Sequence, residues 1–258
     1  MDLPFVSVAT CTYGRPALLE EAIESFFRQD YQGPKEMVVL NTLTAQCLSL
    51  DHPEVRVINW PERPAKLGTA RNLCIDACRG TVIVSLDDDD LLRPHYLRMA
   101  VSDMQLTGKE WLRPGGLITL VDRTSFQVGA GGAVNQLIYT KVLWCNVGGY
   151  PDQNSGEDAG FVERLDSAAV KGSVHHPLEE SGYIYGWGTN GGLVRHASYD
   201  PVEEAGQQSD GAEKTKAFVS DLIARGRIPT GDVLLRPHWK QDYEAEFLKW
   251  LANRPPTK

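Results

Sequence analysis

Two hydrophobic periods alternate along the first hundred residues, and this alternation restricts the possible folds more than any other feature of the chain. Short apolar runs predict buried strands at 5–9, 37–40, 55–58 and 81–86. Between and after them, apolar residues at helical spacing follow Pro16, Gly68 and Pro94. Strands that alternate with helices of this length predict an α/β fold with a mostly parallel sheet covered on both faces.

The pattern loosens after about residue 110. We predict a strand at 117–121, a helix that begins near Asp158, and an amphipathic C-terminal helix with Tyr243 and Phe247 on its apolar side. The helix after Gly68 is predicted to end at Gly80, and the polar stretch 200–216 is predicted to be a loop that closes over a ligand.

The chain shows no clear linker, so we predict one structural domain with three parts. The parts are residues 1–110, which end after the four aspartates, residues 111–200, and residues 201–258, which form a polar loop and a terminal helix.

Charge and targeting features point to an intracellular protein. The formal net charge of -8 disfavours a general nucleic-acid binder. The five cysteines lack the paired spacing of a zinc site, which favours reduced thiols. The N-terminus has no basic, apolar leader pattern, and no window approaches 18 apolar residues. These features predict a cytoplasmic protein without a transmembrane segment.

Three polar clusters follow predicted parallel strands. They are "TCTYGR" at 10–15, "NTLT" at 41–44 and "DDDD" at 87–90. In open α/β sheets, ligands bind beyond the carboxyl ends of the strands. We therefore expect the three clusters to line one crevice.

The four consecutive aspartates need a positive partner. Neighbouring carboxylates about 4 Å apart would repel each other by roughly 4 kcal/mol at an effective dielectric constant near 20. In an extended segment, Asp87 and Asp89 would point one way and Asp88 and Asp90 the other. Such a pair of carboxylates suits a hard divalent ion, Mn²⁺ or Mg²⁺, that bridges to a diphosphate. The alternative is a solvated turn in which Asp90 caps the next helix.

A second acidic pair, Glu157 and Asp158, follows a glycine-bearing loop. One of these acids could serve as a general base, or the pair could simply stabilise a helix N-terminus. Spacing does not separate the two interpretations. Either His196 or His238 could complete a metal shell, and an ordinary hydrogen-bonded histidine is an equal alternative.

Several segments together resemble the family 2 glycosyltransferases of the GT-A fold. They are "VSVATCTYGRPALLEEAIESFFRQDY", "MVVLN", "LGTARNLCIDACRGTVIVSLDDDDLLRPHYL" and "GGYPDQNSGEDAGFVERL". The resemblance covers roughly residues 4–200 and rests on the order and spacing of the motifs. It implies a GT-A type α/β/α sandwich with a Rossmann-like sheet and a C-terminal extension on the acceptor side. Residues 1–110 would then form the nucleotide-sugar binding half, and residues 111–200 the acceptor-binding half that carries the catalytic base. The implied activity is metal-dependent transfer of a sugar from a nucleotide diphosphate sugar, with inversion.

The resemblance also implies roles for particular residues. Asp158 would be the catalytic base, with Glu157 beside it shaping the acceptor site, and Asp89, Asp87 and His196 would hold the metal ion. The nucleotide and donor sugar would be bound by Thr10, Thr12, Tyr13, Arg15, Asn41, Gly68, Arg71, Asn72, Asp87 and Asp88.

Two departures from the family pattern bear on the donor. Asn41 and Thr42 stand where the family usually has an Asp-Asp or Asp-Asn pair, so a carboxylate contact to uracil is lost. Gly14 replaces the usual asparagine of "Tyr-Asn-Arg". UDP remains the favoured donor nucleotide.

Other functions remain open from the sequence. A non-catalytic sugar-nucleotide binding module would keep the pocket but would not need Asp158, and a nucleotidyltransferase would need a glycine- and lysine-rich signature that "TCTYGRP" lacks. The expected acceptor is a hydroxyl group of a saccharide, and the acidic charge disfavours a modified base in DNA. Aromatic residues that could stack on an acceptor sugar are Trp111, Trp144, Tyr185 and Trp187.

Overall fold

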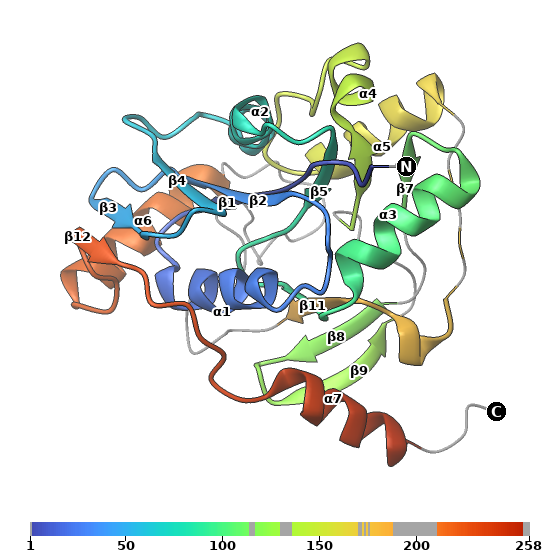
Figure 1. Cartoon of the computed structure of the whole chain (residues 1–258). Helices are drawn as coiled ribbons and strands as arrows, with labels where there is room; N and C mark the ends of the chain where they lie inside the picture. The colour runs from blue at the N-terminus through green and yellow to red at the C-terminus, as the bar shows by residue number, and fades with distance from the viewer. Residues whose placement is uncertain are drawn as a thin grey trace, which may run out of the picture.

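A mixed sheet at the centre of the structure carries helices on both faces (Figure 1). The computed structural model describes residues 2–113, 117–129, 136–169, 172, 174, 176–187 and 211–254. The sheet runs in the order β4 (Val55–Asn59), β2 (Lys35–Asn41), β1 (Val6–Thr12), β5 (Val82–Ser85), β10 (Ile138–Thr140) and β7 (Trp111–Leu112). Strands β4, β2, β1 and β5 are parallel, and β10 is antiparallel to both of its neighbours.

Alternate residues of the parallel strands face two separate hydrophobic clusters. Val8 and Val39 pack on the side of α1 (Pro16–Phe27) and α3 (Tyr96–Thr107). Ala9 and Val38 pack on the other side, against α2 (Leu67–Ala77) and α5 (Glu157–Ala168). Short helix α4 (Lys141–Asn146) lies on this second side. Burial on both faces explains why these strands appear in the sequence as continuous apolar runs, and it confirms the predicted α/β/α arrangement.

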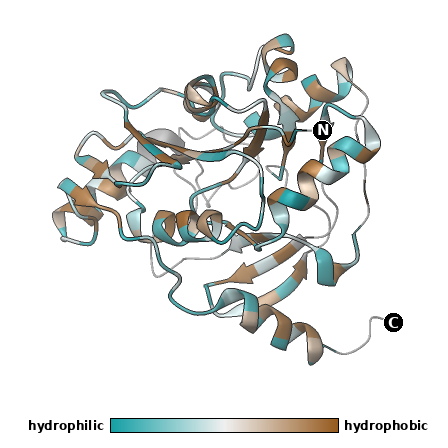
Figure 2. Cartoon of the chain, in the orientation of Figure 1, coloured by the Kyte–Doolittle hydropathy of each residue, from teal (hydrophilic) through white to brown (hydrophobic). Residues whose placement is uncertain are grey.

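The sequence features that predicted α1, a proline at its start and an apolar seam, have the expected positions in the structure. Pro16 occupies its first turn, where a missing N–H costs little. The apolar seam Leu19, Ile23 and Phe26 is fully buried against the sheet. Figure 2 shows the resulting alternation of hydrophobic and hydrophilic residues along this helix.

A second sheet lies beside the first and ends near the acidic turn. Its order is β6 (Leu91–Leu92), β11 (Tyr183–Trp187), β8 (Leu117–Val121) and β9 (Ser125–Gly129), and the short 3-10 helix η1 (Leu178–Glu180) precedes β11. Helix α7 (Tyr243–Ala252) packs on this sheet through Tyr243 and Phe247, as the amphipathic pattern predicted. Asp242 caps α7 by accepting a hydrogen bond from the Ala245 backbone N–H at 3.1 Å.

Residues 211–234 also contact the first part of the chain. Strand β12 (Gly231–Leu234) pairs in parallel with β3 (Gln46–Ser49), a strand that the sequence analysis did not predict. Helix α6 (Gly211–Ala224) packs through Val219 and Leu222 against Tyr13. Residues 211–216, which were predicted to belong to a loop, are therefore the first turns of a helix, and residues 200–210 lie outside the described residues. None of the described helices has the length and apolar character needed to cross a bilayer.

Helix α2 ends at Ala77, three residues before the predicted stop at Gly80. Gly80 has a different role, because its Cα lies against the start of β1. A Cβ placed there would be 2.6 Å from the Ser7 backbone nitrogen and 2.8 Å from the Phe5 carbonyl oxygen. The glycine therefore permits close approach between β1 and the chain that enters β5.

Replacing Gly80 by alanine should force the backbone of β1 away from its neighbour. We expect Gly80→Ala to lower the free energy of unfolding by about 2–3 kcal/mol, measured by urea denaturation. Gly108→Ala is the control, because a Cβ there meets nothing within 4 Å and only the positive φ of 63° opposes it. Its expected cost is about 1 kcal/mol. Equal costs at the two positions would contradict the tight packing at Gly80.

Candidate active site

The four aspartates form a turn instead of continuing the strand. Strand β5 ends at Ser85, and the Asp90 backbone N–H donates to the Asp87 carbonyl oxygen at 3.1 Å. The predicted alternation of side chains is therefore wrong, because it required an extended backbone through Asp90. Asp88 and Asp90 are fully buried, and Asp89 is 3% exposed.

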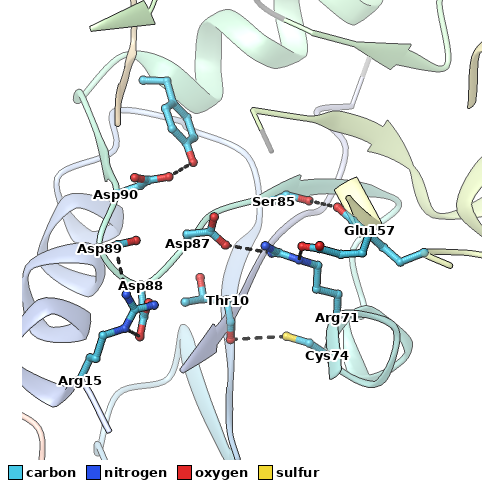
Figure 3. A network of polar contacts seen from close by, with 12 residues as sticks. Thr10, Arg15, Arg71, Cys74, Ser85, Asp87, Asp88, Asp89, Asp90 and Glu157 are labelled. Carbon is cyan, nitrogen blue, oxygen red and sulfur yellow. Dashed lines mark hydrogen bonds and ion pairs between the residues drawn. The ribbon is translucent and has the colours of Figure 1, made fainter. Parts of the chain in front are cut away.

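Arg15 is one of the positively charged partners that were predicted for the four aspartates. Its guanidinium donates to Asp88 through Nη2 and Nε, and to Asp89 Oδ2 through Nη1 at 3.0 Å (Figure 3). Burial alone would lower the pKa of Arg15, but attraction to Asp88 and Asp89 outweighs it and raises the pKa. Burial raises the pKa of Asp88 to about 6, against the attraction of Arg15. Thr12 adds a hydroxyl donor to Asp88 at 2.6 Å.

Arg71 is the second positive partner. It projects from α2 between Asp87 and Glu157, and donates to Asp87 Oδ1 at 2.9 Å and to Glu157 Oε1 at 3.2 Å (Figure 3). Burial would lower the pKa of Arg71, and the two carboxylates raise it well above its usual range. Burial raises the pKa of Glu157, and Arg71 opposes that shift. Two arginines thus bind three of the four aspartates and one acid of the second pair.

Asp90 does not cap the next helix, α3. Its side chain instead binds strand β11 of the second sheet. Its carboxylate accepts from the Tyr183 hydroxyl and, at 2.7 Å, from the Gly186 backbone N–H. The N-cap position of α3 is occupied by His95. Burial raises the pKa of Asp90 well above its usual range, and repulsion from Asp89 adds to the effect.

Helix α2 is held by the loop that leads to α5. Asn72 accepts from the Tyr150 backbone N–H at 2.8 Å and donates to the Tyr150 carbonyl at 2.8 Å. A Cβ at Gly68 would lie 1.8 Å from the Pro151 carbonyl oxygen. Gly68 and Asn72 were predicted to contact the donor, but their observed contacts join α2 to this loop.

Asn41 is likewise used within the protein. Its side-chain oxygen accepts from the Leu43 backbone N–H at 3.1 Å, and its amide donates to the Gln46 carbonyl at 3.0 Å and to Asn59 at 2.9 Å. The side chain therefore shapes the turn after β2. This use argues against the direct contact to a nucleobase that was predicted for Asn41.

A pocket opens at the carboxyl edge of β1, β2 and β5, where the sequence analysis placed the crevice. Its lining includes the predicted Thr12, Tyr13, Arg15, Arg71 and Asp87. Thr10 lies behind the lining, fully buried. Other residues that line the pocket were not predicted from the sequence, and they include Arg63, Lys66 and Asn154. Arg63 and Lys66 lie between β4 and α2, so the rule that ligands bind beyond strand ends could have found them.

The charged side chains that line the pocket are mostly basic. They are Arg15, Arg63, Lys66, Arg71 and one carboxylate, Asp87. Arg15 and Arg71 also bind carboxylates outside the lining, those of Asp88, Asp89 and Glu157. The Arg63 guanidinium also lies 3.9 Å from the centre of the Tyr13 ring. Cationic side chains around an aromatic ring suit a ligand that combines phosphates with a planar base.

Glu157 and Asp158 lie in different surroundings at the start of α5. Glu157 is buried beside Arg71, whereas Asp158 is half-buried and accepts a hydrogen bond from the Ala159 backbone N–H at 2.8 Å. Both acids lie in the first turn, where carboxylates favour the helix dipole. The structure thus leaves Asp158 as the more accessible of the two.

The remaining predicted residues fall outside this cluster. His196 lies outside the described residues. His238 is exposed, and its ring contacts the Arg236 carbonyl oxygen at 2.8 Å. Trp111 and Trp144 are buried in the core, which rules against stacking on an acceptor, whereas Trp187 is 43% exposed.

Metal binding would have to use few protein ligands. Among the described residues, no three His, Cys, Asp or Glu side chains form a group suited to a metal ion. Mg²⁺ needs only one or two carboxylates when phosphate and water supply the rest. Asp87, which lines the pocket, and the neighbouring Asp89 fit that limited requirement, although each already binds an arginine.

Solved structures with the same fold include that of S. aureus TarS 1-349. It matches with a TM-score of 0.56 and 17% identity over 72% of this chain and 60% of that chain. TarS 1-349 in complex with UDP-GlcNAc matches with a TM-score of 0.58 and 14% identity over 86% of this chain and 66% of that chain. The complex with UDP gives a TM-score of 0.56 and 14% identity over 87% and 71% of the two chains. No curated protein matches the chain at a significant level.

The fold is of the GT-A type, and its pocket lies at the carboxyl edge of the parallel strands. Residues 7–112 match the family described as Glycosyl transferase family 2. This segment contains most of the sequence motifs quoted above, and its match confirms the resemblance to this family. The chain spans 60% of the first TarS structure.

The raised pKa of Asp90 predicts how stability depends on pH. As pH falls, folded Asp90 binds its proton before the unfolded chain does, so protonation favours the folded state. We expect the wild type to gain stability from this group as pH falls through the raised pKa of folded Asp90 toward the usual carboxylate range. Asp90→Asn should reduce that gain in thermal unfolding. Asp76→Asn, on the exposed face of α2, should leave it unchanged. An unaltered pH profile in Asp90→Asn would contradict the assignment.

Proposed function

We propose that this protein transfers a sugar from a nucleotide diphosphate sugar to a hydroxyl group of an acceptor. The observation that carries the proposal is the pocket at the carboxyl edge of the sheet, with four basic side chains and one carboxylate in its lining. A nucleoside diphosphate carries the negative charge and the aromatic base that such a lining complements. UDP is the favoured nucleotide, because TarS structures of the same fold contain UDP and UDP-GlcNAc.

Asp158 is the proposed general base. It stands at the start of α5 and is joined to the pocket through its neighbour Glu157 and through Arg71. Removing the acceptor's proton makes its oxygen a better nucleophile for attack on the anomeric carbon of the sugar. Attack from the side opposite the leaving diphosphate inverts that carbon.

Charge on the leaving diphosphate would be balanced by the basic lining. Arg71 and Lys66 lie at the N-terminal part of α2, where the helix dipole adds to their field. Asp87 and Asp89 would hold the Mn²⁺ or Mg²⁺ ion that the sequence analysis predicted. When bound, such an ion stabilises negative charge on phosphate oxygens.

The proposed acceptor is a saccharide. Tyr185 and Trp187 support this choice, because both lie on β11, whose Gly186 binds Asp90, and their ring centres are 5.8 Å apart. Aromatic side chains of this kind stack on the apolar faces of sugar rings. The two residues flank Gly186, whose backbone N–H donates to Asp90 in the acidic turn, and this position supports the proposed role.

Donor binding tests the proposal directly. We expect isothermal titration to show binding of UDP-GlcNAc or UDP in preference to GDP, TDP or CDP compounds, each measured with Mg²⁺, Mn²⁺ or EDTA. Asp89→Asn should reduce the metal-dependent part of the affinity, because it removes a charged ligand while Asp88 still binds Arg15. The wild type must retain its thermal stability under each condition. If none of these nucleotides binds with any metal, the proposed function is wrong.

The role of Asp158 requires a separate measurement. Asp158→Asn should slow release of the sugar to water from a bound nucleotide sugar by about 10²- to 10⁴-fold, because the general base is lost. Nucleotide affinity should stay close to the wild-type value. Asp166→Asn, which removes an exposed charge from the same helix, is the control. A binding module without catalysis would show no difference among the three proteins.

A further inference from the structure

Arg71 belongs to two parts of the site at once. It lines the pocket proposed for the donor, and it also binds Glu157 at the start of α5. Its side chain is 10% exposed, and its two ion-pair partners, Asp87 and Glu157, lie at 2.9 Å and 3.2 Å. The same guanidinium therefore serves the nucleotide pocket and the helix that carries Asp158.

Glu157 reduces the positive charge that Arg71 offers to a ligand. The Glu157 carboxylate is 5% exposed, so water screens it only weakly. A diphosphate that approaches Arg71 must overcome repulsion from this carboxylate as well as from Asp87. Glu157 consequently opposes donor binding by its charge, although it lies outside the pocket lining.

The Glu157 contact also fixes the beginning of α5. The loop before α5 is attached to α2 by Gln153, whose carbonyl accepts from Gly68 N–H at 3.1 Å, and by Asn154, which accepts from Leu67 N–H at 2.9 Å. Those attachments stop at Asn154. Ser155 and Gly156, the latter with φ of 72°, then separate them from α5. The Glu157–Arg71 pair attaches the first turn of α5, directly beside Asp158, whereas Arg164 attaches a later turn to the Gly148 and Gly149 carbonyls.

We propose that Glu157 is a positioning residue that holds Asp158 beside the donor pocket through Arg71 and, by its charge, weakens donor binding. The inference rests on the proposed function. It assigns opposite effects to one carboxylate, because the charge that fixes α5 also competes with the diphosphate for Arg71. A residue with a purely structural role would not strengthen nucleotide binding when its charge is removed.

Two substitutions separate the charge of Glu157 from its contact. Glu157→Gln keeps the shape and a hydrogen-bond acceptor for Arg71 but removes the charge, whereas Glu157→Ala removes both. Isothermal titration with UDP and with UDP-GlcNAc should show about 3- to 10-fold tighter binding to Glu157→Gln than to the wild type. Glu163→Gln, which removes a charge from the exposed face of the same helix, should bind as the wild type does.

Turnover provides the second readout. Release of sugar from UDP-GlcNAc to water should be slower in Glu157→Ala than in Glu157→Gln by about 10-fold or more, because only the glutamine keeps a polar contact between Arg71 and the first turn of α5. Weaker or unchanged nucleotide binding by Glu157→Gln would overturn the inference, and so would equal turnover in the two folded variants. If the wild type binds neither nucleotide, the proposed function itself fails, and the inference fails with it. Binding to the wild type therefore distinguishes the two failures.

Discussion

The placement of two guanidinium groups among buried carboxylates is the interaction on which the rest of the site depends. Arg15 binds Asp88 and Asp89, and Arg71 binds Asp87 and Glu157. Removing one partner from a buried pair of this kind typically costs about 3–5 kcal/mol, because the other charge is left without compensation. The two arginines come from different elements, the loop after β1 and helix α2. The acidic turn therefore joins both to the end of β5.

The sheet brings these groups together because its parallel strands end at one edge. The register pairs Thr12 with Asn41 at the ends of β1 and β2, and the acidic turn follows β5 next to β1. Helices on both faces exclude water from the strands, so the ion pairs lie in surroundings of low polarity. Electrostatic attraction is stronger there than at the surface, and an unpaired charge is correspondingly more costly.

Much of the fold could be predicted from local sequence, and less of the site. Continuous apolar runs identified β1, β2, β4 and β5, and Pro16 marked the start of α1. The roles of Asn41 and Asn72 could not be predicted, because an amide donates and accepts equally well toward a ligand or toward the backbone. The pairing of Arg71 with Glu157 joins residues 86 positions apart, and no periodicity reports such a contact. Strand β3 was missed because it is short and its partner is a distant strand.

The position of the C-terminal segment has a consequence for how the protein folds. Gln46 donates a hydrogen bond to the carbonyl of Pro229, 183 residues later in the chain, and β12 completes its two-stranded sheet with β3 nearby. Contacts of such large sequence separation form slowly, because a long loop must close before they contribute. During synthesis, α6 cannot cover Tyr13 until the chain has been made through Gly211–Ala224. The residues that line the pocket all lie between Cys11 and Asn154, so they are synthesised well before the helix that packs on Tyr13.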